Sequence, residues 1–553
     1  MTPAGTVRVI PLGGIGEIGK NMTVVESDAG IVVIDAGIAF PRDEMLGVDL
    51  VLPDFAYLRE HAGPIRAVIL THGHEDHVGG LPYLIREIGV DEVWATRLTL
   101  GLIKSKLDEH GLIRAAELRE IEPAKGIVPV GPFEAEFIRV THSIPDAVAV
   151  VLHTAEGTIV HTGDIKIDHT PIDGRRTELH RFGAVGEAGV ALLLGDSTNA
   201  ERAGSTPSEA TVAESLKRIV RDAPGRVIVT SFASHIHRLQ EVIDAAVACD
   251  RRVCVVGRSM TKNLNIARNL GYARVPDGVL VKATELDEHA PERLVILCTG
   301  SQGEPLSALT RIAYDDHATV RVRPGDTVIM SAKPVPGNEL AVHDTMNQLW
   351  RQGATVLHQD IAPVHVSGHG SADELKTVLA LVRPDHFLPV HGEMRHLVAH
   401  AQLAEEMGVP RDRIFVAENG ACLELRGGVV TRAANVDAGV VFVDGLGIGD
   451  IADVVLRDRR QLSADGVLII VCQLHPDADH PEPEVIARGF APEGAEEASE
   501  LLADVQRCAA EALAKISERE TKIVQSHLHD EVAELVYKRA SKRPLILPVV
   551  VEI

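Results

Sequence analysis

The stretch Thr71-His72-Gly73-His74-Glu75-Asp76-His77 determines how this sequence is interpreted. It directly follows the apolar run Ala67–Leu70, which predicts a strand whose carboxyl end leads into the loop. The first two histidines are two residues apart and can converge on one cation, whereas the aspartate and the third histidine can reach a second cation nearby. A helix predicted over Val78–Ile88 would hold the end of the loop. The stretch therefore predicts a metal site.

Four donors in one loop do not fill two coordination shells, so the other ligands are expected at other strand ends. His142, Asp164 and His391 each follow an apolar run and stand next to small or turn residues. Asp164 is the natural bridging carboxylate for two cations, which lie about 3.5–4 Å apart in such sites. Asp35, at the end of Ile31–Ile34, is either a ligand or a helper that orients a ligand imidazole, and we favour the helper.

The composition is that of a globular chain with an acidic balance. The 553 residues include 55 Lys and Arg against 79 Asp and Glu, which gives a net charge of −24. A hydrophobic fraction of 45% and a charged fraction of 24% exclude a disordered chain. No apolar run approaches the roughly 18 residues that span a bilayer, and Met1–Ile10 shows no secretory signal. We therefore expect a cytoplasmic location and no membrane association.

Histidine, not cysteine, carries the metal signal. The six cysteines form no C-x-x-C pair and are best interpreted as small hydrophobic residues. The 26 histidines, in contrast, gather beside Asp and Gly. A metal bound by this chain should therefore have nitrogen and oxygen ligands.

The order of predicted strands and helices along the chain indicates one domain interrupted by another. Short β-rich runs fill the first part, alternating helices and strands typical of a parallel sheet follow, and the histidine-rich strand pattern then returns. The predicted parts are a first domain (1–207), an inserted domain (208–350), the second part of the first domain (351–430), a linker (431–465) and a C-terminal domain (466–553).

Three other enzyme classes are disfavoured. Gly14-Ile15-Gly16-Glu17-Ile18-Gly19 matches the dinucleotide fingerprint, but Met22–Glu26 after it is predicted to be a strand, where that motif needs a helix. We interpret it as a tight turn. The metalloprotease motif H-E-x-x-H and the serine-hydrolase motif G-x-S-x-G are both absent from the sequence.

The ligand pattern resembles the metallo-β-lactamase superfamily, and three later segments resemble its beta-CASP group of nucleic-acid-processing enzymes. These segments contain Asp196, His369 and His391. Several strings over nearly the whole chain are similar to the bacterial ribonuclease J family: Pro11–Asn21, Thr141–Asp146, Asp196–Glu201, Cys298–Pro305 and Asp444–Asp450. The resemblance implies an α/β fold: an αββα metallo-β-lactamase sandwich with an inserted beta-CASP α/β domain and a small α+β C-terminal domain.

The resemblance also implies roles for the site residues. One zinc would be bound by His72, His74 and His142, the other by Asp76, His77 and His391, with Asp164 bridging and manganese as the alternative metal. His369 would approach the scissile phosphate as a donor or acid. The catalytic set would be His369, Asp76, Asp35 and Asp196.

Glycine-containing loops are candidates for holding phosphate, since converging N–H groups bind anions. The predicted set is His365, Val366, Ser367, Gly368, His369, Ser301, Gly303 and Ser234. For Ser234 an ordinary helix cap explains the sequence equally well. Asp49 and Asp444 lie in segments that hold a structural cation in this family, for which calcium is suitable, but exposed turn aspartates explain them equally well.

The implied function is 5′→3′ exonuclease activity on 5′-monophosphorylated single-stranded RNA with some endonuclease activity, acting in mRNA turnover and rRNA maturation. The implied partners are RNA, a second or further copies of the chain in a homodimer or homotetramer through the C-terminal domain, and other RNA-decay proteins. Only 3% of the residues are aromatic, so few bases can be stacked and little sequence specificity is expected. The alternative is a two-zinc hydrolase of small molecules.

Overall fold

The computed structural model describes residues 5–42, 44–60, 65–335, 337–445, 447–449, 453–474, 482–490, 496–516 and 520–552. The chain divides into two compact units, Met1–Phe40 with Leu50–Val441 and Pro41–Asp49 with Phe442–Ile553. Each unit is described by itself. Among the described residues, no helix combines the length and the apolar character needed to cross a membrane.

The first unit contains two sheets rich in buried β-branched residues. The first sheet has the order β23-β22-β1-β3-β4-β6-β7-β8. Its strands are β1 (Val7–Gly13), β3 (Met22–Ser27), β4 (Gly30–Ile34), β6 (Ile65–Ile69), β7 (Glu92–Ala95), β8 (Glu117–Glu120), β22 (Leu423–Arg426) and β23 (Val429–Arg432). A strand, β3, and not a helix follows the glycine-rich segment, which confirms that the segment is not a dinucleotide fingerprint. The prediction of a simple tight turn is wrong, because Ile15–Gly16 form the short strand β2, which pairs with β21 (Gly392–Glu393).

The second sheet has the order β20-β13-β12-β11-β10-β9. Its strands are β9 (Val128–Val130), β10 (Phe133–Arg139), β11 (Val148–Thr154), β12 (Gly157–His161), β13 (Leu192–Asp196) and β20 (His386–Val390). β12, β13 and β20 run parallel, so their carboxyl ends meet at one edge. β20 comes from beyond residue 350, which places the returning segment in this sheet.

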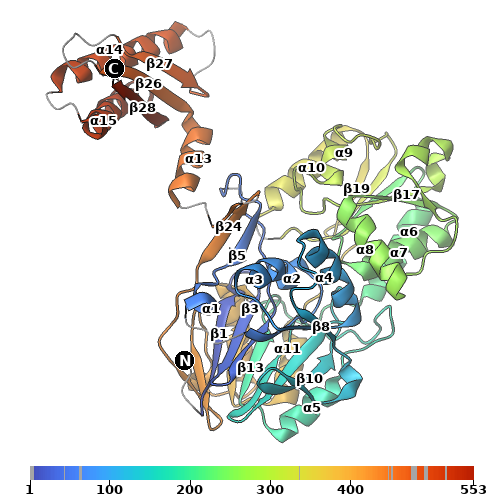
Figure 1. Cartoon of the computed structure of the whole chain (residues 1–553). Helices are drawn as coiled ribbons and strands as arrows, with labels where there is room; N and C mark the ends of the chain where they lie inside the picture. The colour runs from blue at the N-terminus through green and yellow to red at the C-terminus, as the bar shows by residue number, and fades with distance from the viewer. Residues whose placement is uncertain are drawn as a thin grey trace. The chain divides into compact units, whose positions relative to one another are not determined.

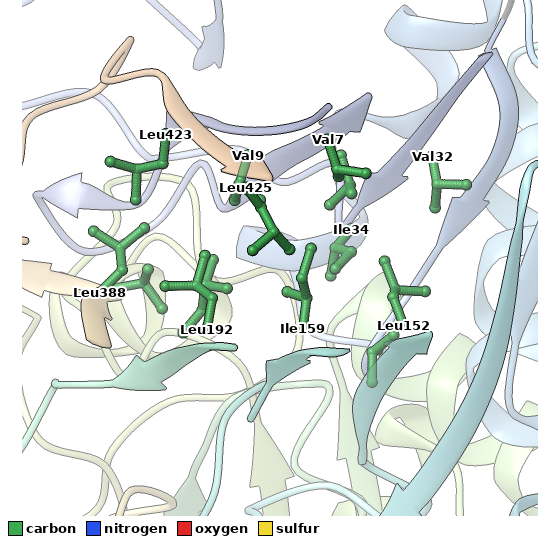
Figure 2. Close-up of a cluster of buried hydrophobic side chains, with 14 of the residues drawn as sticks. Val7, Val9, Val32, Ile34, Leu152, Ile159, Leu192, Leu388, Leu423 and Leu425 are labelled. Atoms are coloured by element: carbon green, nitrogen blue, oxygen red, sulfur yellow. The ribbon is translucent and has the colours of Figure 1, made fainter. Parts of the chain in front are cut away.

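The two sheets face each other across one hydrophobic core (Figure 2). Figure 2 shows side chains of the first sheet pointing toward those of the second: Val7, Val9, Val32, Ile34, Leu423 and Leu425 against Leu152, Ile159, Leu192 and Leu388. The outer face of the second sheet is covered by α5 (Leu179–Ala188), α11 (Ala372–Val382) and α12 (Met394–Glu406). On the other side, α4 (Arg97–Glu109) contacts β8 of the first sheet. The expected αββα sandwich is thereby confirmed.

The inserted segment forms a parallel sheet with the order β16-β15-β17-β14-β18-β19. Its strands are β14 (Val227–Thr230), β15 (Arg252–Val256), β16 (Leu280–Val281), β17 (Leu294–Cys298), β18 (Thr327–Met330) and β19 (Thr355–Leu357). Helices α6 (Glu209–Asp222), α7 (Ile236–Ala248) and α8 (Arg258–Leu270) pack on one face, and α9 (Ala308–Ala313) and α10 (Glu339–Arg351) on the other (Figure 1). The predicted α/β insertion is present, but its sheet also includes β19, which lies beyond residue 350, the predicted end of the insertion.

The second unit contains a three-stranded sheet with the order β27-β26-β28. Its strands are β26 (Val467–Leu474), β27 (Glu484–Arg488) and β28 (Leu545–Glu552), and α14 (Glu496–Lys515) and α15 (Thr521–Ala540) cover one face (Figure 1). Residues 431–465, which the sequence predicts to be a linker, contain β24 (Val440–Asp444), β25 (Gly447–Ile448) and α13 (Asp453–Asp465).

Candidate metal centre

The histidine-rich loop lies against the segment that follows β4, and the backbone fixes it there. Ala36 N–H donates to His77 O (2.8 Å) and Asn21 N–H donates to Asp76 O (3.0 Å). A Cβ on Gly37 would lie only 1.7 Å from Asp76 O, so only glycine permits this approach. The loop continues into α2 (Glu75–Val78), and α3 (Leu81–Glu87) follows after Gly79 and Gly80. The single helix predicted over Val78–Ile88 is therefore wrong, because this glycine pair packs against the same segment and interrupts the helix.

One group of donors combines the beginning of the loop with two other strand ends. It consists of His72, His74, His142 and Asp164, whose ligand atoms lie within 4.8 Å of one another. His74 Nδ1 is 3.1 Å from both His72 Nε2 and His142 Nε2. Asp164 Oδ2 is 3.5 Å from those same two Nε2 atoms. Four donors facing a common point match the ligand number of a zinc site.

A second group shares Asp164 and adds the end of the loop and β20. It consists of Asp76, His77, Asp164 and His391. Asp164 Oδ2 lies 3.3 Å from His77 Nε2, and Asp76 Oδ2 lies 3.6 Å from His77 Nε2 and 3.5 Å from His391 Nε2. His391 Nε2 is buried without a hydrogen-bond partner. A buried imidazole nitrogen without a partner is costly in a protein interior, so this group is suited to a bound cation.

Electrostatics in the two groups favour cations. Burial is the largest influence on His72 and His142 and lowers the pKa of each well below its ordinary value; it lowers that of His74 to about 4. These imidazoles are neutral at pH 7, which is the form that binds metal.

In the second group burial opposes protonation, but carboxylates outweigh it. Asp164, the main opposing influence on both histidines, raises the pKa of His77 well above its ordinary value and that of His391 to about 10. The Asp164 pKa is held well below its usual range against burial, chiefly by His391 and His77. The carboxylates that raise these two pKa values would also stabilise a bound cation.

Hydrogen-bond partners outside the cluster, here called outer partners, orient two of the imidazoles. Asp35 Oδ2 lies 2.7 Å from His77 Nδ1, while its Oδ1 accepts from Thr71 N–H (2.8 Å). His142 Nδ1 lies 2.7 Å from Gly368 O. Both oxygens can only accept, so each Nδ1 carries a proton, and each Nε2 is left as the ring atom that faces the cluster and can bind a metal. Asp35 therefore occupies the place of the predicted helper.

His369 and Asp196 form a pair at the rim of the cluster. His369 Nδ1 is 2.8 Å from Asp196 Oδ2, and His369 Nε2 is 3.9 Å from Asp164 Oδ2. Burial alone would lower the pKa of His369, but Asp196 and Asp164 raise it above its ordinary value. His369 is 16% exposed and the Asp196 carboxyl is buried. A protonated imidazole held at the edge of the cluster is suited to proton donation.

The loop around His369 is held by residues that sequence reasoning missed. Asn199 Nδ2 donates to Ser367 Oγ (2.8 Å) and to His369 O (2.9 Å). Thr206 Oγ1 donates to the same carbonyl (2.7 Å). Asn199 lies in the string Asp196–Glu201 that carries the family resemblance, so the sequence could have indicated it as a site residue. Nothing in the sequence singles out Thr206.

The other predicted phosphate residues are spread over three places. Gly368 and Val366 lie in the His369 loop, whereas His365 lies beside Arg238, and burial, the largest influence, lowers the pKa of His365 to about 3. Ser234, Ser301 and Gly303 follow β14 and β17, parallel neighbours in the inserted sheet. Their role in binding phosphate stays a prediction.

The two aspartates predicted as candidates for a structural cation have partners within the chain. Asp49 Oδ2 accepts from Gly445 N–H (2.8 Å), and Asp444 Oδ2 accepts from Arg459 Nη2 (2.6 Å). Across the described ranges, three groups of metal-binding side chains occur, and all contain Asp164; the third joins it to Asp196, His369 and His391. Nothing in this geometry favours calcium at Asp49 and Asp444.

The fold and the cluster define a metallo-hydrolase class, and sequence comparisons agree. Residues 15–229 match the family described as metallo-beta-lactamase superfamily, and residues 354–416 match a Zn-dependent metallo-hydrolase RNA specificity domain. Residues 224–349 match the beta-CASP domain of ribonuclease J and residues 454–553 its C-terminal domain.

Full-length relatives identify the family. The chain is 46% identical to ribonuclease J of Thermus thermophilus, covering 100% of this chain and 96% of that protein. It is 41% identical to ribonuclease J2 of Bacillus subtilis, covering 99% of each. The chain belongs to the ribonuclease J family of RNA-processing, metal-dependent nucleases. In fold alone, it is similar to a solved protein of unknown function from Enterococcus faecalis (TM-score 0.53, 16% identity, 76% of this chain and 100% of that one).

Proposed function

We propose that this chain removes nucleotides from the 5′ end of 5′-monophosphorylated single-stranded RNA, with some endonuclease activity, in mRNA turnover and rRNA maturation. The observation that carries the proposal is that two donor groups share Asp164 beside the His369–Asp196 pair. Membership of the ribonuclease J family favours RNA over the small molecules of the alternative function.

The cofactors are proposed to be two zinc ions, with manganese as the alternative. His72, His74 and His142 would hold one and Asp76, His77 and His391 the other, with Asp164 between them. Imidazole and carboxylate donors without a thiolate suit either metal. When bound, two such ions lower the pKa of a water to supply hydroxide near neutral pH and stabilise charge on the phosphate.

The protein's own residues supply the rest of the chemistry. Asp35 and Gly368 O keep His77 and His142 in the tautomer that faces the cluster. His369, protonated and held by Asp196, is placed to give a proton to the leaving ribose oxygen. The loop from His365 to His369 is the proposed site for the substrate's phosphate.

The C-terminal domain is proposed to join copies into a homodimer or homotetramer. β28 is an edge strand of its sheet. Its alternate residues Leu547, Val549 and Val551 lie on the face opposite the α14–α15 side and are 42–44% exposed. Three exposed apolar side chains on an edge strand are typical of a surface that another chain covers. We also propose that the chain binds other RNA-decay proteins and is located in the cytoplasm.

The test is digestion of single-stranded RNA carrying either a 5′-monophosphate or a 5′-triphosphate, with zinc or manganese supplied. Mononucleotides released from the monophosphate strand are the expected result. Equal cleavage of both strands would contradict the role of the 5′ end. Failure of metal-loaded protein to cleave either strand would contradict the ribonuclease itself and support a hydrolase of small molecules.

A further inference from the structure

A buried guanidinium lies where the inserted domain meets residues 364–369, the loop that ends at His369 and is called the catalytic loop below. Arg238 is on α7 and is 0% exposed. Its Nη2 donates to Glu209 Oε2 (2.6 Å) and its Nε donates to Glu241 Oε2 (2.7 Å). The three side chains therefore lie in the first two turns of α6 and α7, out of water.

The same guanidinium reaches the segment that leads to His369. Arg238 Nη1 donates to Val364 O (2.8 Å) and to Ser331 Oγ, and Ser331 Oγ donates to the same Val364 carbonyl (2.7 Å). The Val364 and Val366 side chains pack in the hydrophobic cluster formed by α6, α7 and the inserted sheet. The start of the loop thus belongs physically to the inserted domain.

The end of the loop belongs to the metal-binding domain. Asn199 and Thr206 donate to His369 O, and His142 Nδ1 donates to Gly368 O. Residues 364–369 are consequently held from both sides, and a change at Val364 O is only five residues from the His369 imidazole. Such a short segment transmits a displacement of its first residue to its last.

We propose that Arg238 is a positioning residue for the reaction: through the Val364 carbonyl it sets where His369 stands relative to the metal centre. The inference rests on the proposed role of His369 in RNA cleavage. Arginine is suited to this place because its planar fork reaches two carboxylates and a carbonyl together, which a lysine ammonium cannot do. Apolar packing in place of a buried ion pair is often equally stable, so the presence of this cluster is not explained by net stability alone.

The chain contains a matched control. Arg226 is also buried in the inserted domain and pairs with Asp326 through two hydrogen bonds (3.0 and 2.6 Å). It precedes β14, whereas Arg238 and Ser331 lie beyond the carboxyl ends of β14 and β18. Arg226→Lys thus makes the same chemical change in the same domain at the opposite end of the sheet.

The test compares Arg238→Lys, Arg226→Lys and the wild type by single-turnover RNA cleavage, RNA affinity, metal content and melting temperature. For Arg238→Lys we expect cleavage to slow about tenfold or more, because a displaced acid loses part of the rate enhancement that a general acid supplies. RNA affinity and metal content should be unchanged. For Arg226→Lys we expect the wild-type cleavage rate. If Arg238→Lys does not fold, Ser331→Ala weakens the same link without altering a charge and should slow cleavage in the same direction.

A double-mutant cycle separates positioning from general damage. In a His369→Ala background, Arg238→Lys should cost less than twofold, because the group it positions is gone. Full additivity of the two losses, or equal rates for the two lysine variants, would overturn the inference. A wild-type enzyme that does not cleave RNA would instead contradict the proposed function, so the two failures are distinguishable.

Discussion

Among the described residues, the buried charges around Asp164 and those around Arg238 are completed in different ways. Around Asp164, carboxylates and imidazoles face one another, and His391 Nε2 makes no hydrogen bond. Around Arg238, a guanidinium donates to two carboxylates, a hydroxyl and a carbonyl. Both clusters have lost the solvation that water provides, but only the second contains its own permanent cation.

This difference indicates what each cluster does. A set of buried acceptors without a fixed cation binds cations from solution, so its affinity and its protons are linked. A set that includes arginine is complete in the folded chain and acts as a structural connection. The first cluster is thus a site for chemistry, and the second, by our inference, determines where one of its groups stands.

The largest effect is expected from breaking the first cluster. His77→Ala removes a donor of the second group, so RNA cleavage should fall by more than the roughly 100-fold that loss of an outer partner costs. Metal content should drop toward one ion per chain, measured by elemental analysis. His169→Ala, an exposed histidine outside the cluster, is the control and should change neither. Two retained ions in His77→Ala would contradict the proposed ligand set.

The next effect concerns the acid at the rim. His369→Ala should lower the single-turnover rate of RNA cleavage about 10²–10⁴-fold, the usual contribution of a general acid. The proposed ligands are unchanged, so both metal ions should stay bound. A p-nitrophenyl phosphodiester, whose leaving group needs no proton, should lose much less activity. An equal loss of cleavage rate with both substrates would contradict the role of His369 as the general acid.

A smaller effect is expected from the outer partner of His77. In Asp35→Asn an amide group can donate toward His77 Nδ1, which favours the tautomer with a proton on Nε2, facing the cluster. Affinity for the second metal should fall about 10–100-fold, as is usual for such partners. Metal titration followed by calorimetry measures it, and unchanged affinity would contradict the orienting role.

The smallest effect tests the second cluster. Burial, together with Glu209, outweighs Arg238 and raises the pKa of Glu241 from 4.5 to about 7. Between these two pH values the unfolded chain releases the proton of Glu241 while the folded chain retains it. This residue therefore makes folding less favourable as pH rises. A tenfold difference in proton affinity between the two states changes the free energy of unfolding by about 1.4 kcal/mol.

Glu241→Gln removes that proton equilibrium. The melting temperature of this variant relative to the wild type should therefore increase from pH 5 to pH 8, measured by scanning calorimetry. Glu214→Gln, an exposed position on α6, should show no such trend. A constant difference across the pH range would mean that Glu241 is already ionised at pH 5.

Much of the fold was visible in the sequence because local patterns determine local structure. The apolar runs around residues 7–34 and 148–161 became strands, and the alternating insertion became a parallel sheet. The helix over Val78–Ile88 failed because periodicity does not record that Gly79 and Gly80 lie against the backbone after β4. Close approach between distant segments has no local signature.

The candidate site divides in the same way. The donors in residues 71–77 are close in the chain, so their convergence could be inferred from spacing alone. His142, Asp164 and His391 were identified by their place after strands and by resemblance to a family. Asn199 Nδ2 and the Arg238 fork were missed as contacts, since an amide or a guanidinium becomes informative only once its acceptor is known.

The sequence by itself determined the class of fold, the donor types and the family, because these depend on residue identity and on spacing along the chain. Only the tertiary structure decided that Asp164 is shared by three donor groups, that His369 pairs with Asp196, and that Arg238 connects the inserted domain to the loop that ends at His369. Each of these depends on residues that are far apart in the chain and meet at strand ends. Packing of the sheets brings these side chains into contact, so the distances between them are defined only in the folded state.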